Sequence, residues 1–413
     1  MPSPPKIHIL GLGNLGRLFA HALATSTHAP SITLLFHRFS LQEDWDAAGR
    51  QIEITSKDLT TSSTSSNYCI EVIDQDIPPP HQNAPQNLDS KSQSSDAKPE
   101  NETSIIQNLI ITTKTLHTVR ALRPLAHRLN HSSTLLFAQN GMGTIDEVTT
   151  SLFSNPATRP RYLAAITSHG VYSTGPFRSV HAGLANVTIG AVEPRVGSGV
   201  EDSGNDSNSE SLQTTALLKA VIDAPVLSAT AVSASSLKYL QLEKLTINAL
   251  INPLTAILHV KNGELLNHPA VRKIMLRLVE ECSRILLSLP ELQGRSSPQS
   301  IGVQGKSADA TVNENTKDGA RDQNTMTIDQ RFAPARLEAL VVDVARKTAA
   351  NTSSMLQDVQ AGRATEIDYI NGYFVRRAKE MGISCEWHER LAGMVREGVR
   401  LEVDDIKALV GDD

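Results

Sequence analysis

A glycine-rich turn close to the amino terminus is the feature that most limits the possible folds. The β-type segment Lys6–Leu10 leads directly into this turn, and residues 17–24 after it have the pattern of a helix. A strand, the pattern G-x-G-x-x-G and a helix in this order are typical of the dinucleotide-binding unit of a doubly wound parallel sheet. The turn consists of Gly11, Leu12, Gly13, Asn14, Leu15 and Gly16.

Each glycine of this turn has a separate physical role in such a unit. Gly11 permits the tight turn, Gly13 lets the backbone approach a pyrophosphate, and Gly16 allows the helix to pack closely against the strand. The helix N-terminus then offers unpaired N–H groups and the positive end of its dipole to the phosphates. We therefore expect residues 11–16 to bind a dinucleotide.

The residues that follow the second strand bear on which dinucleotide is bound. This strand is predicted at Ser31–Phe36 and is followed by His37 and Arg38. Units that bind NAD usually place an acidic residue about 20 residues past the glycines, where it binds the ribose hydroxyls. Arg38 can instead pair with a 2′-phosphate through its planar guanidinium group. The sequence favours NADP(H), with an ordinary solvated arginine at a strand end as the alternative.

The rest of the first half alternates strands and helices, as a doubly wound sheet does. Strands are predicted at 105–111, 134–138, 162–169 and 185–189, with a helix from about 116 to 129. Lys114 and Asn140 follow two of these strands, at the edge where open α/β sheets bind ligands. They are candidates for contacts with the cofactor or substrate. Asn140 has an alternative role as the cap of a helix that begins near Thr144.

In the second half, the segment Leu237–Asn252 is predicted to be a helix with a narrow polar stripe on an apolar surface. A helix that is apolar nearly all round is normally buried, so the stripe is expected inside the protein or along a cleft. Pro253 has no N–H group, so the helix should kink or end there. The alternative is a helix whose polar edge lies in water. The stripe consists of Gln241, Lys244, Asn248, Asn252 and Thr255.

Lys244 gives this stripe a chemical meaning. Burial makes an ammonium group costly, and the pKa of a buried lysine falls. A lysine with a lowered pKa is suited to act as a general acid near neutral pH. Asn248 and Asn252 can donate and accept hydrogen bonds, so they could orient Lys244 and a bound oxygen atom.

Further helices are predicted at 269–289 and 334–350. Ser353 or Ser354 should cap a short helix that closes at Gly362, and Thr365 should cap the next helix, with Glu366 in its first turn. Taken alone, Ser354 is explained by capping and Glu366 by a favourable place at a helix N-terminus.

Three segments differ from the rest in composition. Residues 56–103, 194–211 and 293–323 are rich in Ser, Pro, Gly, Asn and Gln, and we expect them to be disordered insertions without a catalytic role, apart from a short strand near 68–73. The predicted architecture is an N-terminal Rossmann-type domain, residues 1–228, followed by an all-α domain, residues 229–413.

Composition excludes several classes of function. The net charge of −5 and the aromatic content of 4% do not suggest a nucleic-acid-binding surface. Cys69, Cys282 and Cys385 are too widely spaced for a disulfide framework or a metal site, so no metal is expected. No apolar run reaches membrane-spanning length, and a strand begins within a few residues of Met1. We expect a cytoplasmic protein, with mitochondrial import left open.

Taken together, the motifs resemble those of the ketopantoate reductase (2-dehydropantoate 2-reductase) family, and the long insertions resemble those of its fungal members. The matching motifs are G-L-G-N-L-G at 11–16, T-K at 113–114, Q-N-G-M-G at 139–143, E-K-L-x-x-N-x-x-x-N-P-L-T-A at 243–256, S-S-M-L-Q-D at 353–358 and E-I-D-Y-I-N-G at 366–372. The resemblance implies a Rossmann domain, a helical C-terminal domain of the 6-phosphogluconate dehydrogenase type, and a site in the cleft between them. It also implies reduction of 2-dehydropantoate to (R)-pantoate with NADPH, on the route to pantothenate and coenzyme A.

The resemblance also implies a role for each matching residue. Lys244 would donate the proton to the keto oxygen, and Glu366 would orient the substrate and Lys244. Arg38 would hold the 2′-phosphate. Residues expected to contact the substrate are Asn248, Asn252, Ser354 and, less securely matched, Asn262. Residues expected to line the cofactor side are Lys114 and Asn140.

Two departures from the family pattern are visible. Gln139 stands where a histidine often precedes N-G-M-G, and residues 181–186 are less rich in glycine than the family's stretch. Neither removes a proposed catalytic residue. The only partner expected is a small 2-keto acid, and the sequence leaves open whether the chain is a monomer or a homodimer.

Two other functions are compatible with the sequence. One is a related reductase of another branched 2-keto acid, because pocket shape decides between such substrates. The other is a non-catalytic NADP-binding paralogue. That protein would be expected to lack Lys244, Asn248 or Glu366, or to carry a basic patch, and this chain keeps all three residues.

Overall fold

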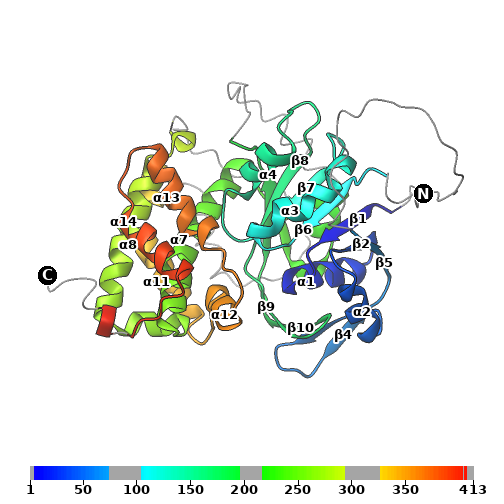
Figure 1. The fold of residues 1–413 in the computed structure, drawn as a ribbon, viewed down its shortest axis with the longest axis horizontal. Coiled ribbons are helices and arrows are strands. Elements are labelled where there is room, and N and C mark those ends of the chain that lie inside the picture. The colour runs from blue at the N-terminus through cyan, green and yellow to red at the C-terminus, as the bar shows by residue number, and fades with distance from the viewer. Residues whose placement is uncertain (1–3, 74–103, 196–215, 294–325, 403, 407–413) are drawn as a thin grey trace, which may run out of the picture. The chain divides into compact units, whose positions relative to one another are not determined.

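The computed structural model describes residues 4–73, 104–195, 216–293, 326–402 and 404–406. Contacts divide the chain into two units (Figure 1). Unit 1 comprises residues 1–139 and 145–231, and unit 2 comprises residues 140–144 and 232–413. The break at 231/232 lies three residues after the predicted boundary, and the transfer of residues 140–144 to unit 2 was not predicted.

Unit 1 is built on an eight-stranded sheet with the order β12-β11-β8-β7-β6-β1-β2-β5. The strands from β5 to β8 are parallel, β11 runs antiparallel to β8, and β12 runs parallel to β11. The six parallel strands follow the Rossmann order 3-2-1-4-5-6, which confirms the predicted fold class. The strands are β1 (Lys6–Leu10), β2 (Ser31–Phe36), β5 (Tyr68–Val72), β6 (Asn108–Ile111), β7 (Thr134–Phe137), β8 (Arg161–Thr167), β11 (Val187–Ala191) and β12 (Ala229–Ala231).

Apolar side chains fill both faces of this sheet, as expected for buried parallel strands. Ile7 and Ile9 of β1 belong to a core shared with α1 (Asn14–Ala24) and α6 (Ala216–Ile222). Leu10, on the other face, belongs to a core shared with α3 (Thr118–Leu122) and α4 (Thr144–Leu152). The alternation of side chains along each strand therefore places helices on both faces.

A second, four-stranded sheet in unit 1 was not predicted. It has the order β4-β3-β10-β9, and its strands contact α1 on the side away from β1 and β2 (Figure 1). These strands are β3 (Ile52–Ser56), β4 (Ser62–Ser65), β9 (Gly170–Gly175) and β10 (Arg178–Gly183). Helix α2 (Ser40–Ala47) precedes β3 and buries Trp45.

The first predicted insertion is therefore wrong over residues 56–67, which contain β4, whereas the short strand predicted near 68–73 is confirmed as β5. Composition misled the prediction because the serines are used in the fold. The Ser65 hydroxyl is buried and bonds the Nδ1 atom of His21 at 2.9 Å and the hydroxyl of Tyr68 at 2.5 Å. Residues 74–103 lie outside the described residues, as do all but 194–195 of the second predicted insertion and all but 293 of the third.

The single helix predicted at 116–129 is also wrong. The chain forms a 3₁₀ turn, η2 (Thr115–His117), then the short helix α3, then a second 3₁₀ segment, η3 (Arg123–Arg128). Pro124 explains the break, because it has no N–H group to continue α-helical hydrogen bonding.

Unit 2 is helical, and α7 (Ala234–Leu258) is its central element. Helices α8, α11, α12 and α14 all contact α7, and residues 249–258 are buried without exception. The other elements are η5 (Asn262–Asn267), α8 (Pro269–Leu287), η6 (Pro290–Leu292), α10 (Ile328–Arg331), α11 (Pro334–Lys347), α12 (Ser354–Gln360), η8 (Ile367–Tyr369), α13 (Asn371–Glu380) and α14 (Glu386–Arg396).

Helix α7 is longer than predicted at both ends. The Ser233 hydroxyl caps its N-terminus, and the helix continues through Pro253 to Leu258 rather than ending at Asn252. Packing on several sides holds the last turns in helical form despite the proline. Among the described helices, none combines the length and the apolar character needed to cross a membrane.

Candidate active site

The glycine turn of unit 1 leaves open space above the N-terminus of α1. Gly11 has φ +98°, and a Cβ atom there would lie 2.5 Å from the Thr113 nitrogen. A Cβ atom on Gly16 would overlap the carbonyl oxygen of Gly11, whereas one on Gly13 would meet nothing within 4 Å. Leu12 is buried, and Asn14 and Leu15 begin the helix. This shape lets an anion reach the free N–H groups of α1.

Arg17 connects this turn to the small sheet, a contact that the sequence analysis missed. Its Nε atom donates to the carbonyl oxygen of Leu12 at 3.0 Å. Its Nη1 atom donates to the carbonyl oxygen of Gly175 at 2.9 Å and to the hydroxyl of Ser173 at 3.1 Å. Burial lowers the pKa of Arg17 from its ordinary value. Arg17 was missed because its partners lie in the β9–β10 hairpin, which was not predicted from the sequence.

Basic groups gather at the carboxyl end of β2. Arg38 is exposed directly after this strand. The pKa of His37 is lowered by burial first and then by the positive charges of Arg38, His117 and Arg120. His117 and Arg120 come from the segment after β6, and neither was predicted as a site residue. Lys114, half-buried, immediately precedes η2.

Asn140 is half-buried in the short segment that belongs to unit 2. The N–H group of Met142 donates to the carbonyl oxygen of Tyr369 at 2.8 Å. Gly141 has φ +80°, and a Cβ atom there would lie 2.6 Å from the same oxygen. Helix α4 begins at Thr144, so Asn140 does not occupy its N-cap position and the alternative capping role is wrong.

Lys244 and Glu366 come together within unit 2. Lys244 lies on α7 with only part of its side chain accessible, and burial lowers the pKa of its ammonium to about 8, against an upward effect from the charge of Glu366. The Glu366 side chain is buried. Lys244 is thus protonated at neutral pH but close to the pH at which it releases its proton, which suits a general acid.

The predicted helix around Glu366 is wrong. Glu366 immediately precedes the three-residue η8, and the α-helix α13 begins only at Asn371, so Thr365 does not cap a helix that contains Glu366. A three-residue 3₁₀ turn has little dipole to stabilise a carboxylate. The explanation of Glu366 as a helix-terminus residue therefore loses its support.

The polar stripe of α7 is linked by a hydrogen bond to the N-cap of the helix that carries Ser354. Asn248 is half-buried and Asn252 is buried. The hydroxyl of Thr255, on the same stripe, donates to the Ser353 hydroxyl at 2.7 Å. Ser353 is the N-cap of α12, so the capping explanation of Ser354 is wrong, and the Ser354 side chain is exposed.

Asn262 is buried at the start of η5. Its Nδ2 atom donates to the hydroxyl of Thr348 at 2.9 Å, and its backbone N–H donates to the carbonyl oxygen of Asn351 at 3.1 Å. Its Oδ1 atom has no hydrogen-bond partner among the described residues. Part of the Asn262 amide thus has a structural role, and only the oxygen remains for a ligand.

Asn371 and His388 are further polar residues that the sequence analysis missed. Both are fully buried against α7, and the Nδ2 atom of Asn371 donates to the carbonyl oxygen of Ala249 at 2.9 Å. The sequence predicted a disturbance at Pro253 but gave no signal for the residue that compensates for it.

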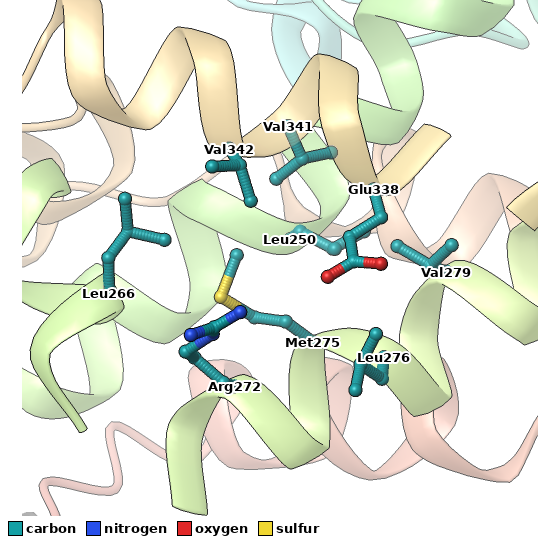
Figure 2. Close-up of a pocket in the computed structure, with 9 residues that line it drawn as sticks. All are labelled: Leu250, Leu266, Arg272, Met275, Leu276, Val279, Glu338, Val341 and Val342. Carbon is teal, nitrogen blue, oxygen red and sulfur yellow. The ribbon is translucent and has the colours of Figure 1, made fainter. Parts of the chain in front are cut away.

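A small hollow in unit 2 lies apart from these residues (Figure 2). Its wall is mostly aliphatic and contains none of the predicted site residues. The lining residues are Leu250, Leu266, Arg272, Met275, Leu276, Val279, Glu338, Val341 and Val342. Within the described part of the chain, no group of three or more His, Cys, Asp or Glu side chains could hold a metal ion.

Comparisons with known proteins agree with the division of the chain into two parts. Residues 7–194 match the family described as "Ketopantoate reductase PanE/ApbA", and residues 236–399 match its C-terminal part, "Ketopantoate reductase PanE/ApbA C terminal". The chain belongs to the ketopantoate reductase family. The two matches together span both units.

Relatives of this ketopantoate reductase family member fall into two groups, according to the substrate in their names. "Ketoisovalerate reductase BEA2" of Gibberella fujikuroi is 29% identical, with 97% of this chain and 84% of that protein covered. "Probable 2-dehydropantoate 2-reductase" of Schizosaccharomyces pombe is 28% identical, with 92% of each chain covered. The chain is thus in a family of oxidoreductases that act on small 2-keto acids.

A solved structure supports the fold. D-mandelate dehydrogenase in its ternary complex with NADH and anilino(oxo)acetate aligns with a TM-score of 0.64 at 17% identity, covering 97% of this chain and 99% of that one. The fold is one in which a nicotinamide dinucleotide is bound, and family members use such a cofactor.

Proposed function

We propose that this protein reduces 2-dehydropantoate to (R)-pantoate with NADPH. The observation that carries the proposal is the pairing of Lys244, on the mostly buried helix α7, with Glu366, which precedes η8, with the Lys244 pKa lowered to about 8. Asn248 and Asn252 follow Lys244 at intervals of four residues and so lie on the same face of α7. A cation with two amides beside it can bind a 2-keto carboxylate and polarise its carbonyl group.

The residues of this chain would contribute as follows. NADPH, when bound, supplies the hydride that adds to the keto carbon. The Lys244 ammonium donates a hydrogen bond to the keto oxygen and transfers its proton to that oxygen as the negative charge develops. Glu366 keeps Lys244 protonated and oriented, and Lys244 regains its proton from solvent after release of the hydroxy acid. Asn248, Asn252 and Ser354 would hold the substrate, with Asn262 a weaker candidate.

The cofactor would be held by unit 1. The open space at Gly13 suits the pyrophosphate. Lys114, in the same unit, would contact the cofactor. Asn140, in the segment that belongs to unit 2, would contact the substrate or the nicotinamide ribose. Arg38 would pair with the 2′-phosphate, supported by the positive charge of Arg120 near His37. These charges support a preference for NADPH over NADH.

A second candidate substrate is ketoisovalerate, since the relatives include reductases named for it. The two acids differ by the hydroxymethyl group of 2-dehydropantoate. A site that hydrogen-bonds a substrate hydroxyl rejects the analogue without it, often by about 10⁴-fold, whereas an apolar pocket discriminates only weakly. The ratio of kcat/KM for the two acids therefore decides between the candidates.

The test is the oxidation of NADPH by purified protein, followed at 340 nm with 2-dehydropantoate, with ketoisovalerate and without either acid, and repeated with NADH. We expect the highest kcat/KM with NADPH and 2-dehydropantoate. Preference for ketoisovalerate would replace the proposed substrate. Binding of NADPH without turnover of either acid would contradict the proposal and favour a non-catalytic paralogue.

Pantoate formed by this reaction would feed pantothenate and coenzyme A biosynthesis, and we propose that this occurs in the cytoplasm. Growth of a pantoate-requiring strain carrying the gene would support the role. Failure of an expressed, active protein to restore growth would contradict it.

A further inference from the structure

The central helix of unit 2 contains a gap in its hydrogen bonding that another element fills. In an α-helix the carbonyl of residue 249 accepts from the N–H group of residue 253, but residue 253 is proline. The Nδ2 atom of Asn371, the first residue of α13, donates to this carbonyl at 2.9 Å. Asn371 and Ala249 are both fully buried, so no water competes for the bond.

A buried histidine fixes the orientation of the Asn371 amide. The Nδ2 atom of Asn371 lies 3.0 Å from Nδ1 of His388, and the ring of His388 stacks on Phe374 with 4.8 Å between centroids. Burial lowers the pKa of His388 to about 4, so its ring is neutral and Nδ1 can accept. The Ala249 carbonyl can only accept, which assigns Nδ2 as the amide atom that faces it, and Nδ1 of His388 then accepts the second hydrogen of Nδ2.

The Asn371 amide oxygen has no hydrogen-bond partner among the described residues. A buried polar atom without a partner costs free energy, so the fold retains Asn371 at this position despite a penalty. That penalty is consistent with a function for the two bonds that Nδ2 makes.

The gap lies in the middle of the candidate substrate site. Lys244 and Asn248 precede it on α7, whereas Thr255, which bonds the N-cap of the helix that carries Ser354, follows it. The angle between the two parts of α7 therefore sets the separation between the proposed proton donor and Ser354. Proline gaps are the common place for helices to kink, so this angle needs a support.

Asn371 also lies on the segment that carries Glu366. Only η8 and Ile370 lie between the two residues, and the carbonyl of Tyr369 within that turn accepts from the Met142 N–H at 2.8 Å. The bond from Asn371 to Ala249 thus ties the Glu366 segment to the helix that holds Lys244.

We propose that Asn371 is a positioning residue of the reductase site: by closing the gap at Pro253, it holds Lys244 in place relative to Glu366 and the substrate-binding residues. This inference rests on the proposed function. Its removal leaves the Ala249 carbonyl unsatisfied in the core and lets α7 bend. Misplacement of a catalytic group by about 1 Å can cost roughly 100-fold in rate.

The test is a double-mutant cycle that uses Pro253 as the matched partner. The variants are Asn371→Ala, Pro253→Ala and the double variant. We expect Asn371→Ala to lower kcat by about 10- to 100-fold while leaving NADPH affinity unchanged, because the proposed cofactor residues are elsewhere. In the double variant, alanine at 253 supplies the missing N–H group to Ala249, so the effect of losing Asn371 on kcat should shrink by at least about threefold.

The pH profile separates positioning from a general structural role. If Lys244 and Glu366 move apart, the alkaline pKa of kcat should fall in Asn371→Ala and return toward the wild-type value in the double variant. Wild-type kcat in Asn371→Ala, an unchanged pH profile, or a loss that is the same with alanine at 253 would each overturn the proposal.

Two further measurements keep the result decisive. Should Asn371→Ala be too unstable to purify, Asn371→Ser provides a milder loss of the same bond and enters the same cycle. If the wild-type protein turns over neither acid, the proposed function fails and the positioning role fails with it. The Asn371–Ala249 bond is then still tested by the coupling of the two substitutions in urea unfolding, and additive effects would refute it.

Discussion

At the scale of single residues, the decisive feature is a lysine whose charge is held in place by one buried carboxylate. Burial lowers the Lys244 pKa to about 8, and Glu366 opposes that shift. The acid form of Lys244 is the proposed proton donor, so activity should decline as pH rises through the Lys244 pKa. The neutral substitution Glu366→Gln removes the upward effect and should move this decline to lower pH.

The pH dependence of kcat for the wild type and Glu366→Gln between pH 6 and 10 checks this prediction. We also expect Lys244→Ala to lower kcat by about 10³-fold, because general acid catalysis contributes about 10²–10⁴-fold and one charge-stabilising donor about 10²–10³-fold. An alkaline limb that stays in place or moves upward in Glu366→Gln would contradict the assignment of Glu366.

Arg38 carries a second prediction at this scale. It is exposed at the carboxyl end of β2, and its positive charge lowers the pKa of the neighbouring His37. Arg38→Ala should raise the KM for NADPH by about tenfold or more, since a charge-assisted hydrogen bond to phosphate contributes about 1.5–3 kcal/mol. The KM for NADH should change little. Equal effects on both cofactors would mean that Arg38 does not read the 2′-phosphate.

At the scale of elements, patterns that depend on local sequence were predicted well. The bounds of β1 and β2 were predicted as the structure has them, and the glycine turn follows β1 and runs into the first residues of α1. The predicted polar stripe lies on α7 as a mostly buried helix. Apolar runs, glycine spacing and helical periodicity are local signals, and they were sufficient there.

Elements that depend on distant partners were not predicted. Strand β3 pairs in parallel with β10, more than a hundred residues away, and β4 consists of serine and threonine that the composition assigned to an insertion. The contact of Asn371 with Ala249 spans 122 residues. Tertiary pairing decides such elements, and a single sequence carries no direct record of it.

The β9–β10 hairpin leads to a prediction about cofactor binding. Arg17 joins the glycine turn at Leu12 to this hairpin at Gly175. Arg17→Ala should weaken the hold on the turn and raise the Kd for NADPH by about tenfold, since each hydrogen bond from a charged group contributes about 1.5–3 kcal/mol. Fluorescence titration with NADPH measures the change.

Arg178→Ala is the matched control for this prediction. Arg178 lies in the same hairpin, but its exposed side chain pairs with Glu53 rather than with the glycine turn. We expect NADPH affinity close to that of the wild type. Similar losses in both variants would point to the hairpin as a whole and not to the bonds of Arg17.

At the scale of the whole molecule, buried histidines make stability depend on pH. Burial is the main cause that lowers the pKa to about 4 for His8 and His21 in unit 1 and for His388 in unit 2. Unfolded histidine has a pKa of about 6.5, so the unfolded state binds more protons between these values. The stability that the neutral form of these histidines contributes is therefore fully present above about pH 6.5 and declines as pH falls toward 4.

Urea unfolding at pH 7, 6, 5 and 4.5 tests this dependence. Each of the three histidines contributes a loss of up to about 1.4 kcal/mol per pH unit between its two pKa values. His388→Gln removes one titrating group, so the free energy of unfolding of this variant should vary less steeply with pH. A flat profile between pH 6.5 and 4.5 would show that these histidines are not held in the neutral form.

The division of the chain has a consequence for how the protein could be taken apart or recombined. Residues 140–144 belong to unit 2 although residues on both sides belong to unit 1. A fragment cut at residue 231 would carry Gly141 and Met142 away from the Tyr369 carbonyl that they contact. The helical unit is therefore not an independent genetic module. A chimera that exchanges residues 232–413 between relatives would need matching residues at 140–144 to keep this contact.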